Sequence, residues 1–270
     1  MPKWIWPISI MLATTITGMV PNSVQAMNTK CPIVIAHKGY HYPYGIYPEN
    51  SIAAINAAHN EHAKWIETDT MLSRSGYPII MHGGNVFYNV TGRSGTPANY
   101  WTWDLTHMRL RNAPGMPFTN QHIPTMLQYL WQVKRDHMNV EIEVTSTWNA
   151  KEMATYIRIL KSVQARYYVR VSGWSVKTLA YIRHAYTGMK TDLLTASFWP
   201  APSNGIGGSM QEDALLGYLS MAKVKMLMNS GIRVDIWTPD TRQSIMDALA
   251  LHPTMITTDR LPLYHQLSGC

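Results

Sequence analysis

Short apolar runs alternate with helical hydrophobic patterns along most of the chain. Residues 32–37 (PIVIAH) form a β-branched run bounded by proline and glycine, which predicts a buried strand. Residues 49–63 carry apolar residues at helical spacing and predict a helix, and residues 64–70 predict the next strand. The same rhythm farther on predicts strands at 139–144, 167–171, 191–196, 216–221, 233–238 and 254–259, and helices at 123–136, 149–163, 174–187, 221–230 and 241–251.

Two segments depart from this rhythm. The link at 74–78 (RSGYP) is much shorter than the dozen or so residues that a parallel crossover needs. Residues 66–73 and 78–82 are therefore predicted to form an antiparallel hairpin, which carries His82 back toward strand 64–70. Residues 84–121 contain many turn formers and little periodicity, so we expect a long insertion with one short helix near 104–111.

The number and spacing of the strands indicate the fold class. Without the hairpin strand, eight strands are expected to run parallel, and they begin near residues 32, 64, 139, 167, 191, 216, 233 and 254. Repeated βα units of this size predict an α/β protein, a closed (β/α)₈ TIM barrel with a hairpin and an insertion after its second strand. An open doubly wound sheet is the alternative, but the first strand leads into HKGYHYPYG, which is not the glycine-rich phosphate loop of that fold.

The N-terminal segment has the pattern of a secretory signal. Lys3 precedes an apolar stretch at 4–20, and small residues lead to Ala26, so residues 1–26 are predicted to be removed before Met27. An uncleaved signal anchor is the alternative, because about 17 apolar residues is near the lower limit for a membrane span. We therefore expect an exported protein, periplasmic or extracellular, with residues 27–270 forming a single barrel domain.

Export gives the two cysteines a possible role. Cys31 precedes the first strand and Cys270 ends the chain. An oxidising compartment permits a disulfide between them if the fold brings the two ends together. Two unpaired thiols are the alternative.

Composition and charge narrow the choice of partners. The chain of 270 residues is 46% hydrophobic, which suffices for a large core. Its formal net charge of +7 is spread thinly, and no basic run is interleaved with aromatics, so nucleic acid is not the favoured partner. After signal cleavage no segment is apolar enough over a sufficient length to span a membrane. The mild positive field would help to draw in an anionic substrate.

Ionisable residues gather at predicted strand ends, where the chemistry of such barrels takes place. Glu67 and Asp69 share one face of a strand, and two carboxylates this close repel each other unless a proton or cation lies between them. A hard divalent cation, Mg²⁺ or Ca²⁺, is the natural occupant, with Glu141 from a nearby strand as a third ligand. An E-x-D pair on a solvated strand edge is the alternative.

His37 and His82 are expected to flank that cation. A histidine pair can act as general acid and general base near neutral pH, and together with a cation it suits displacement at phosphorus. For each histidine the alternative is a structural hydrogen bond.

Eight short motifs follow one another along the chain: HKG (37–39), PENS (48–51), IETD (66–69), SGYPIIMHG (75–83), IPTMLQYL (123–130), NVEIEV (139–144), DIWTPD (235–240) and TTDRLP (257–262). In this order they resemble the pattern of one known family, the glycerophosphodiester phosphodiesterases, which are metal-dependent (β/α)₈ barrels. The resemblance implies a glycerophosphodiester or lysolipid substrate and one divalent cation, Ca²⁺ or Mg²⁺.

The resemblance also implies roles for single residues. It makes His37 and His82 the acid–base pair and assigns the cation to Glu67, Asp69 and Glu141. Glu49 and Asn50 would support the site. Trp237 would line the alcohol pocket, with ordinary barrel packing as the alternative.

Three residues depart from the family pattern. Lys38 replaces an arginine and loses its planar bidentate grip on phosphate. Gly83 replaces an aspartate. Glu143 stands where a phosphate-contacting lysine is usual, so we expect it either to weaken binding of an anionic diester or to pair with a cation such as Lys38.

The leading hypothesis is thus an exported, metal-dependent phosphodiesterase that releases an alcohol and a phosphomonoester. The His82-Gly83 pair also resembles the sphingomyelinase D toxins and suggests a phospholipase D-like lipid lyase as one alternative. Glu143 and Gly83 suggest another, a catalytically degenerate barrel that binds a ligand without turnover.

Overall fold

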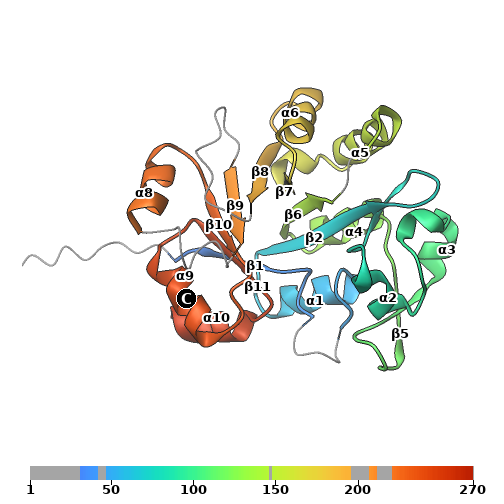
Figure 1. The fold of residues 1–270 in the computed structure, drawn as a ribbon, viewed down its shortest axis with the longest axis horizontal. Helices are drawn as coiled ribbons and strands as arrows, with labels where there is room; N and C mark the ends of the chain where they lie inside the picture. Colours follow the sequence, from blue (N-terminus) through green and yellow to red (C-terminus); the bar gives the residue numbers. More distant parts are fainter. Residues whose placement is uncertain (1–30, 42–46, 146–147, 196–206, 212–220, 270) are drawn as a thin grey trace, which may run out of the picture. The chain divides into compact units, whose positions relative to one another are not determined.

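The computed structural model describes residues 31–41, 47–145, 148–195, 207–211 and 221–269 (Figure 1). Within these ranges no helix combines the length and apolar character that crossing a membrane requires. The predicted signal sequence 1–26 and the cysteine at position 270 lie outside the described residues, so cleavage and disulfide formation remain predictions.

In the described part of the chain, eight parallel strands close into a barrel. They follow the order β1, β11, β10, β9, β8, β7, β6, β2, and β2 pairs with β1 to complete the ring. The predicted (β/α)₈ architecture is therefore confirmed. The strands are β1 (Ile33–Ala36), β2 (Trp65–Leu72), β6 (Asn139–Val144), β7 (Val169–Gly173), β8 (Lys190–Thr195), β9 (Gly207–Gln211), β10 (Val234–Trp237) and β11 (Met255–Thr258).

Helices cover the outside of this barrel (Figure 1). They are α1 (Ile52–Asn60), α4 (Met126–Arg135), α5 (Ala150–Ser162), α6 (Val176–Ala185), α8 (Met221–Asn229), α9 (Arg242–Ala250) and α10 (Leu261–Ser268), with a short 3₁₀ turn η2 (Ala165–Tyr167) before β7. All but α10 match predicted helices. The hydroxyl of Tyr264 in α10 donates to the Pro32 carbonyl oxygen at 2.7 Å, so the last helix packs against the start of the first strand.

The alternation of buried residues decides which side chains face the barrel interior. In β6 the apolar Val140, Ile142 and Val144 belong to the core between strands and helices. Because successive strand residues point to opposite faces, Glu141 and Glu143 face inward. This period of two places carboxylates inside a barrel whose outer layer is apolar.

The strand between β8 and β10 was predicted at other residues than those that form it. The strand expected at 216–221 falls mostly outside the described residues, and Met221 begins α8. The place between β8 and β10 belongs to β9, whose sequence GGSMQ contains no β-branched residue. Its strand conformation comes from pairing on both sides, which local preference does not reveal.

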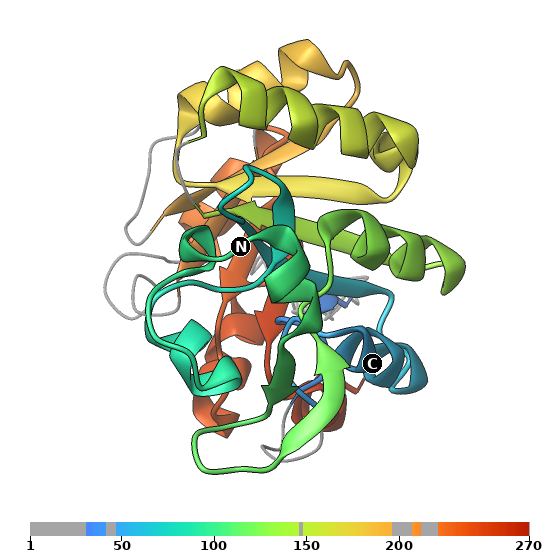
Figure 2. The ribbon, with the colours of Figure 1, turned by 90° about the vertical axis from the view of Figure 1, so that its right-hand side faces the viewer.

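The hairpin prediction is confirmed, and the insertion is more ordered than predicted. β3 (Pro78–Ile80) pairs antiparallel with the end of β2. In place of one helix at 104–111, the insertion holds α2 (Asn85–Thr91), η1 (Pro97–Asn99), α3 (Thr102–His107), β4 (Arg109–Arg111) and β5 (Phe118–His122), seen from the front in Figure 2. Each element has only three to seven residues, too few for its period to be read from sequence.

A close approach behind the first strand shapes the entrance to α1. Gly39 has φ +77°, and a Cβ atom there would lie 2.7 Å from Ala54 Cβ. Ser51 caps α1 by accepting a hydrogen bond from the Ala54 backbone N–H at 3.1 Å. These contacts hold the HKG and PENS motifs side by side at the carboxyl end of β1.

Candidate active site

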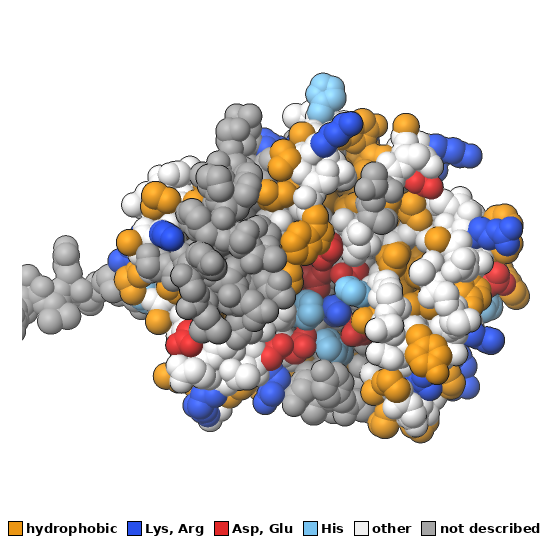
Figure 3. Space-filling model, in the orientation of Figure 1, with side chains coloured by type: hydrophobic (Ala, Val, Ile, Leu, Met, Phe, Trp, Pro, Cys, Tyr) orange, Lys and Arg blue, Asp and Glu red, His pale blue; other side chains and the backbone are white. Residues whose placement is uncertain are grey.

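The carboxyl ends of the strands open on a cavity of about 280 Å³. Figure 3 shows histidine, acidic and basic side chains gathered at its mouth. The lining residues include His37, Lys38, Glu67, Asp69, His82, Glu141, Glu143, Ser172, Trp174, Leu194, Asp235, Trp237, Thr238 and Thr257. Eight of these were singled out from the sequence as residues that bind metal or substrate or transfer protons, so their predicted convergence is observed. Glu49 and Asn50 were expected to support the site from behind.

Three carboxylates come close enough to share a cation. Glu67, Asp69 and Glu143 each offer an oxygen, and these oxygens lie within 4.8 Å of one another. In the register of β2 and β6, Glu67 is paired with Glu141 and Asp69 with Glu143. Such an all-oxygen set suits Mg²⁺ or Ca²⁺.

Glu141, the predicted third ligand, lines the same cavity but lies outside that close group. Its Oε2 atom is 3.7 Å from a guanidinium nitrogen of Arg170. That oxygen is buried and makes no hydrogen bond to any described residue. The structure thus brings Glu143 next to Glu67 and Asp69, and the assignment of Glu141 as a ligand remains a prediction.

The surroundings of the close group disfavour the ionised forms of Glu67 and Glu143. Burial, followed by the charges of Asp69 and Glu143, raises the pKa of Glu67 well above its usual value. Burial and Asp69 raise the pKa of Glu143 to about 7. A divalent cation would favour the ionised form of all three carboxylates.

Lys38 contributes both its backbone and its side chain. With φ +53°, its N–H donates to Glu67 Oε2 at 3.0 Å. Its ammonium lies 3.5 Å from Glu49 Oε1. Burial lowers the pKa of Lys38, but Glu49, Asp69 and Glu67 together raise it above its usual value, so Lys38 is a cation. Glu143 is not its ion-pair partner.

Asn50 holds Asp69 from behind. Its side-chain amide donates to Asp69 Oδ2 at 2.9 Å, and its carbonyl oxygen accepts from Thr68 Oγ1 at 2.5 Å. Asn50 is fully buried with φ +58°. The PENS motif therefore places a donor where it fixes one carboxylate.

His37 belongs to a group that the sequence reading did not identify. Its Nδ1 lies 2.7 Å from Asp259 Oδ1, and His41 Nε2 lies 3.0 Å from the same oxygen. Burial alone would raise the pKa of Asp259, yet hydrogen bonds and charge from the two histidines hold it well below its usual range. Asp259 is therefore an acceptor, and His37 donates through Nδ1. The TTDRLP motif was noticed, but nothing in it indicated a partner 222 residues away.

The second histidine is held in the same tautomer. His82 Nδ1 lies 3.0 Å from the Gly83 carbonyl oxygen, which can only accept, so Nδ1 carries the proton. His37 Nε2 lies 3.8 Å from Glu67 Oε2. Both imidazoles thus keep Nε2 available for proton transfer.

Two tryptophans line another part of the cavity. The Trp174 and Trp237 rings meet edge to face, with centroids 6.1 Å apart. Trp174 Nε1 donates to Glu143 Oε1 at 3.1 Å, and this contact was not foreseen from sequence. The Trp237 indole nitrogen is buried without a hydrogen-bond partner among the described residues, which leaves a donor for a ligand.

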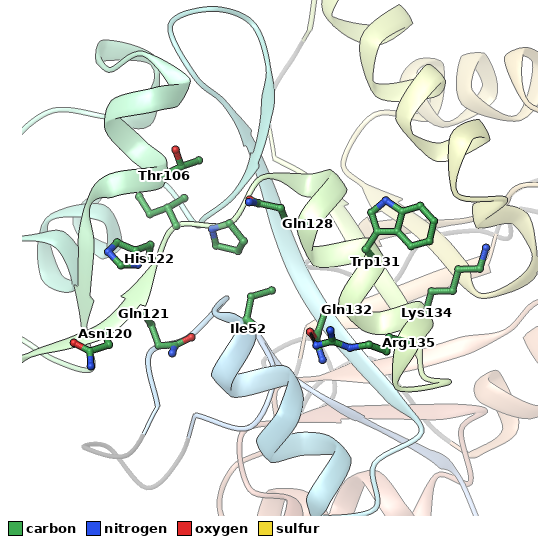
Figure 4. A pocket seen from close by; sticks show the side chains of 12 residues that line it. Ile52, Thr106, Asn120, Gln121, His122, Gln128, Trp131, Gln132, Lys134 and Arg135 are labelled. Carbon is green, nitrogen blue, oxygen red and sulfur yellow. Dashed lines mark hydrogen bonds between the residues drawn. The ribbon is translucent and has the colours of Figure 1, made fainter.

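A larger cavity lies away from these groups. It measures about 830 Å³ and is lined by residues of α1, α4 and the insertion, among them Gln121, Gln128, Trp131 and Lys134 (Figure 4). No carboxylate is found among the described residues that line it. The chemistry of proton transfer therefore belongs to the smaller cavity at the strand ends.

Comparison with known proteins agrees with this geometry. The Glycerophosphoryl diester phosphodiesterase family matches residues 37–263. The chain is 21% identical over 239 residues to the Bacillus subtilis (strain 168) protein YhdW, which is named as a glycerophosphodiester phosphodiesterase, covering 84% of this chain and 93% of that one.

Solved structures share the fold. A glycerophosphodiester phosphodiesterase from Parabacteroides distasonis superposes with a TM-score of 0.72 at 18% identity, covering 88% of this chain and 97% of that one. A phosphodiesterase from Oleispira antarctica, in complex with the product sn-glycerol-3-phosphate, gives a TM-score of 0.71 at 17% identity and covers 89% and 98%. With a family match over most of its length, the chain belongs to the glycerophosphoryl diester phosphodiesterase family and is an enzyme of that type.

Proposed function

We propose that the protein hydrolyses glycerophosphodiester-type substrates to an alcohol and a phosphomonoester, with His37 and His82 as the acid–base pair and one divalent cation as cofactor. The observation that supports this most strongly is the shared cavity. It combines two imidazoles with free Nε2 atoms and three close carboxylates. Few structural roles require that combination at the mouth of a barrel.

The carboxylate group fits a divalent cation. Glu67, Asp69 and Glu143 offer oxygen ligands, and burial together with their mutual repulsion raises the pKa of Glu67 and Glu143. Glu141, with a buried oxygen that lacks a hydrogen bond, is a fourth candidate ligand. When bound, such a cation neutralises the charge of phosphoryl oxygens.

The side chains around it can perform the proton transfers. One imidazole takes a proton from the attacking water as the water oxygen bonds to phosphorus. The other gives a proton to the alcohol oxygen as the P–O bond to the leaving group breaks. Asp259 keeps the His37 ring oriented throughout. Lys38 and Trp237 line the same cavity, and in this proposal the Lys38 ammonium and the Trp237 N–H bind substrate oxygens.

The test is hydrolysis of glycerophosphocholine and of a chromogenic diester by protein with and without added Mg²⁺ or Ca²⁺. A chelator should abolish turnover, and His37→Ala or Glu67→Ala should lower kcat about a hundredfold or more. His59→Ala, which removes an exposed histidine on α1, is the matched control and should keep full activity. Unchanged turnover in both site variants would refute the proposal.

Phosphorus NMR of the products separates the remaining alternatives. A phosphomonoester is expected. A cyclic phosphate formed from lysolipid would identify a phospholipase D-like lyase. Binding detected by calorimetry with no product would identify a degenerate barrel.

Export is part of the same proposal. It rests on the pattern of residues 1–26, and the contact of Tyr264 with Pro32 brings the last helix next to Cys31, as a Cys31–Cys270 disulfide requires. Mass spectrometry of the protein recovered from outside the cytoplasm should give a chain that begins at Met27 and lacks two thiol hydrogens. A cytoplasmic, fully reduced, uncleaved chain would contradict it.

A further inference from the structure

The insertion after β3 presents several large apolar side chains to solvent. They are Tyr88, Trp101, Trp103, Met116 and Phe118, and each is more than two-fifths exposed. The insertion has its own buried core, which includes Phe87, Leu105 and Leu110. The exposed residues are therefore not a core left uncovered by poor packing. They form a surface in addition to that core.

Positive charge accompanies these side chains. Residues 84–122 contain three arginines (Arg93, Arg109 and Arg111) and a single acidic residue, Asp104. Within the described part of the chain, none of these arginines takes part in an ion pair with a carboxylate. In Figure 3, apolar and basic side chains lie together at the right-hand edge, over α2 and α3 of Figure 1.

Four of these apolar and basic residues share one groove. Trp103, Phe118, Arg93 and Arg109 all line a depression of about 830 Å³ on the insertion. Arg111 lies 5.5 Å from the Phe118 ring centroid, and Arg74 of the hairpin turn lies 4.8 Å from that of Trp101. Aromatic rings beside guanidinium groups, with apolar bodies and polar ends, are typical of surfaces at a lipid–water boundary.

We propose that this surface, formed by Tyr88, Arg93, Trp101, Trp103, Arg109, Met116 and Phe118, docks the enzyme on an anionic phospholipid bilayer. The aromatic and methionine side chains enter the headgroup region, and the arginines face lipid phosphates. A neutral protein partner would not explain an excess of arginines that, among the described residues, have no carboxylate partner. The inference is independent of the proposed phosphodiester hydrolysis, because none of these residues lines the catalytic cavity.

The experiment uses the full-length protein with vesicles of equal parts phosphatidylcholine and phosphatidylglycerol, and with vesicles of phosphatidylcholine alone. Amide hydrogen exchange is the readout because it is local. The anionic vesicles should slow exchange in peptides from residues 84–122. Protection restricted to residues 1–30, or no protection at all, would overturn the proposal.

Variants locate the contact. Trp103→Ala with Phe118→Ala should weaken vesicle binding about tenfold or more, because two partly exposed rings lose their apolar contact with lipid. Arg93→Glu should weaken binding about fivefold or more, with most of the loss at low salt. These exposed positions should leave the melting temperature and the hydrolysis of a soluble diester unchanged.

Tyr167→Ala is the matched control. Tyr167 is 69% exposed and Trp103 is 68% exposed. Arg166 lies beside the Tyr167 ring, and Arg109 lines the same depression as Trp103. Tyr167 precedes β7, at the end of the barrel opposite the catalytic cavity. Equal loss of binding in this control would overturn the proposal, as would equal protection of residues 84–122 by soluble glycerol phosphate, which would indicate a small-anion site.

Discussion

Glu143 connects two parts of the catalytic cavity. It offers one oxygen to the group with Glu67 and Asp69, and its Oε1 accepts from the Trp174 indole. The family resemblance led us to expect a lysine here. A carboxylate at this position increases the negative charge available to a cation and removes a direct phosphate contact.

The raised pKa of Glu143 has a consequence for stability. Since its folded-state value of about 7 exceeds the usual 4.5, the metal-free folded protein keeps a proton that the unfolded chain releases. The free energy of unfolding should therefore decrease as the pH rises from 4.5 to 7, by up to about 3 kcal/mol from this group. Urea denaturation of Glu143→Gln without metal should show a flatter pH dependence, and saturating divalent cation should flatten that of the wild type.

The control for this measurement is Glu61→Gln, at an exposed carboxyl that follows α1. Its pH dependence should match the wild type. An unchanged slope in Glu143→Gln would mean that Glu143 is ionised throughout.

We expect Asp259 to act through His37 rather than on substrate, because its Oδ1 accepts the hydrogen bond from His37 Nδ1. Asp259→Asn keeps the shape of the side chain but removes the anionic acceptor of the Nδ1 proton. By analogy with other carboxylates that orient a catalytic histidine, kcat should fall about a hundredfold or more while KM changes little. His41→Gln, which removes the other histidine bonded to Asp259, should have a smaller effect. A wild-type kcat in Asp259→Asn would show that His37 needs no orienting partner.

At the scale of secondary-structure elements, the junction of β1 and α1 fixes several residues of the site. His37, Lys38 and Gly39 leave the strand, and Asn50 and Ser51 enter the helix within contact of them. The Asn50 backbone N–H donates to the Lys38 carbonyl oxygen at 3.0 Å. The position of His37 therefore depends on how closely the loop approaches the helix.

Gly39→Ala tests that approach. An added Cβ would meet Ala54 Cβ at 2.7 Å and Ala54 backbone atoms at 2.9 Å, in addition to the strain of φ +77°. Chemical denaturation should show a loss of about 3 kcal/mol or more, and activity should fall with the displaced loop. Gly115→Ala is the control, because Gly115 has φ +81° with nothing within 4 Å, so only about 1 kcal/mol should be lost. Equal losses would show that the contact with Ala54 is unimportant.

Across the barrel, Arg170 joins strands that are distant in sequence. Its Nε lies 2.9 Å from Asp192 Oδ2 and its NH1 lies 3.7 Å from Glu141 Oε2, while its guanidinium lies 4.7 Å from the Trp65 ring centroid. Burial, Asp192 and Asp235 raise the pKa of Glu141, and Arg170 lowers it. The buried guanidinium of Arg170 thus lies between Asp192 in the barrel interior and Glu141, which lines the cavity.

Arg170→Met should destabilise the fold by about 3–5 kcal/mol, because buried carboxyl groups lose their cation. The melting temperature and the urea midpoint measure the change. Arg166→Met removes an arginine beside exposed Tyr167 and should alter stability by less than about 0.5 kcal/mol. A mild effect of Arg170→Met would mean that Asp192 and Glu141 are protonated or hydrated in the folded state.

Most strands and helices of the barrel could be predicted from the sequence, because the hydrophobic patterns that indicate them extend over only a few neighbouring residues. Period-two runs such as NVEIEV and helical patterns such as 123–136 depend on a few neighbouring residues, and the structure has β6 at the predicted bounds. Local patterns also predicted that the motifs containing His37, Glu67 and His82 lie at the ends of strands. Their convergence followed once eight parallel strands were counted.

Contacts between distant segments could not be predicted in this way. That Glu143 rather than Glu141 joins the close carboxylate group depends on how the side chains of β2 and β6 pack in the closed barrel, where Glu141 lies near Arg170. The contact of His37 with Asp259 depends on β1 lying beside β11. β9 and the short elements of the insertion take their conformation from neighbours rather than from their own residues. Local preference is encoded over a few residues, whereas these features arise only when the ring of strands closes and brings chain segments together.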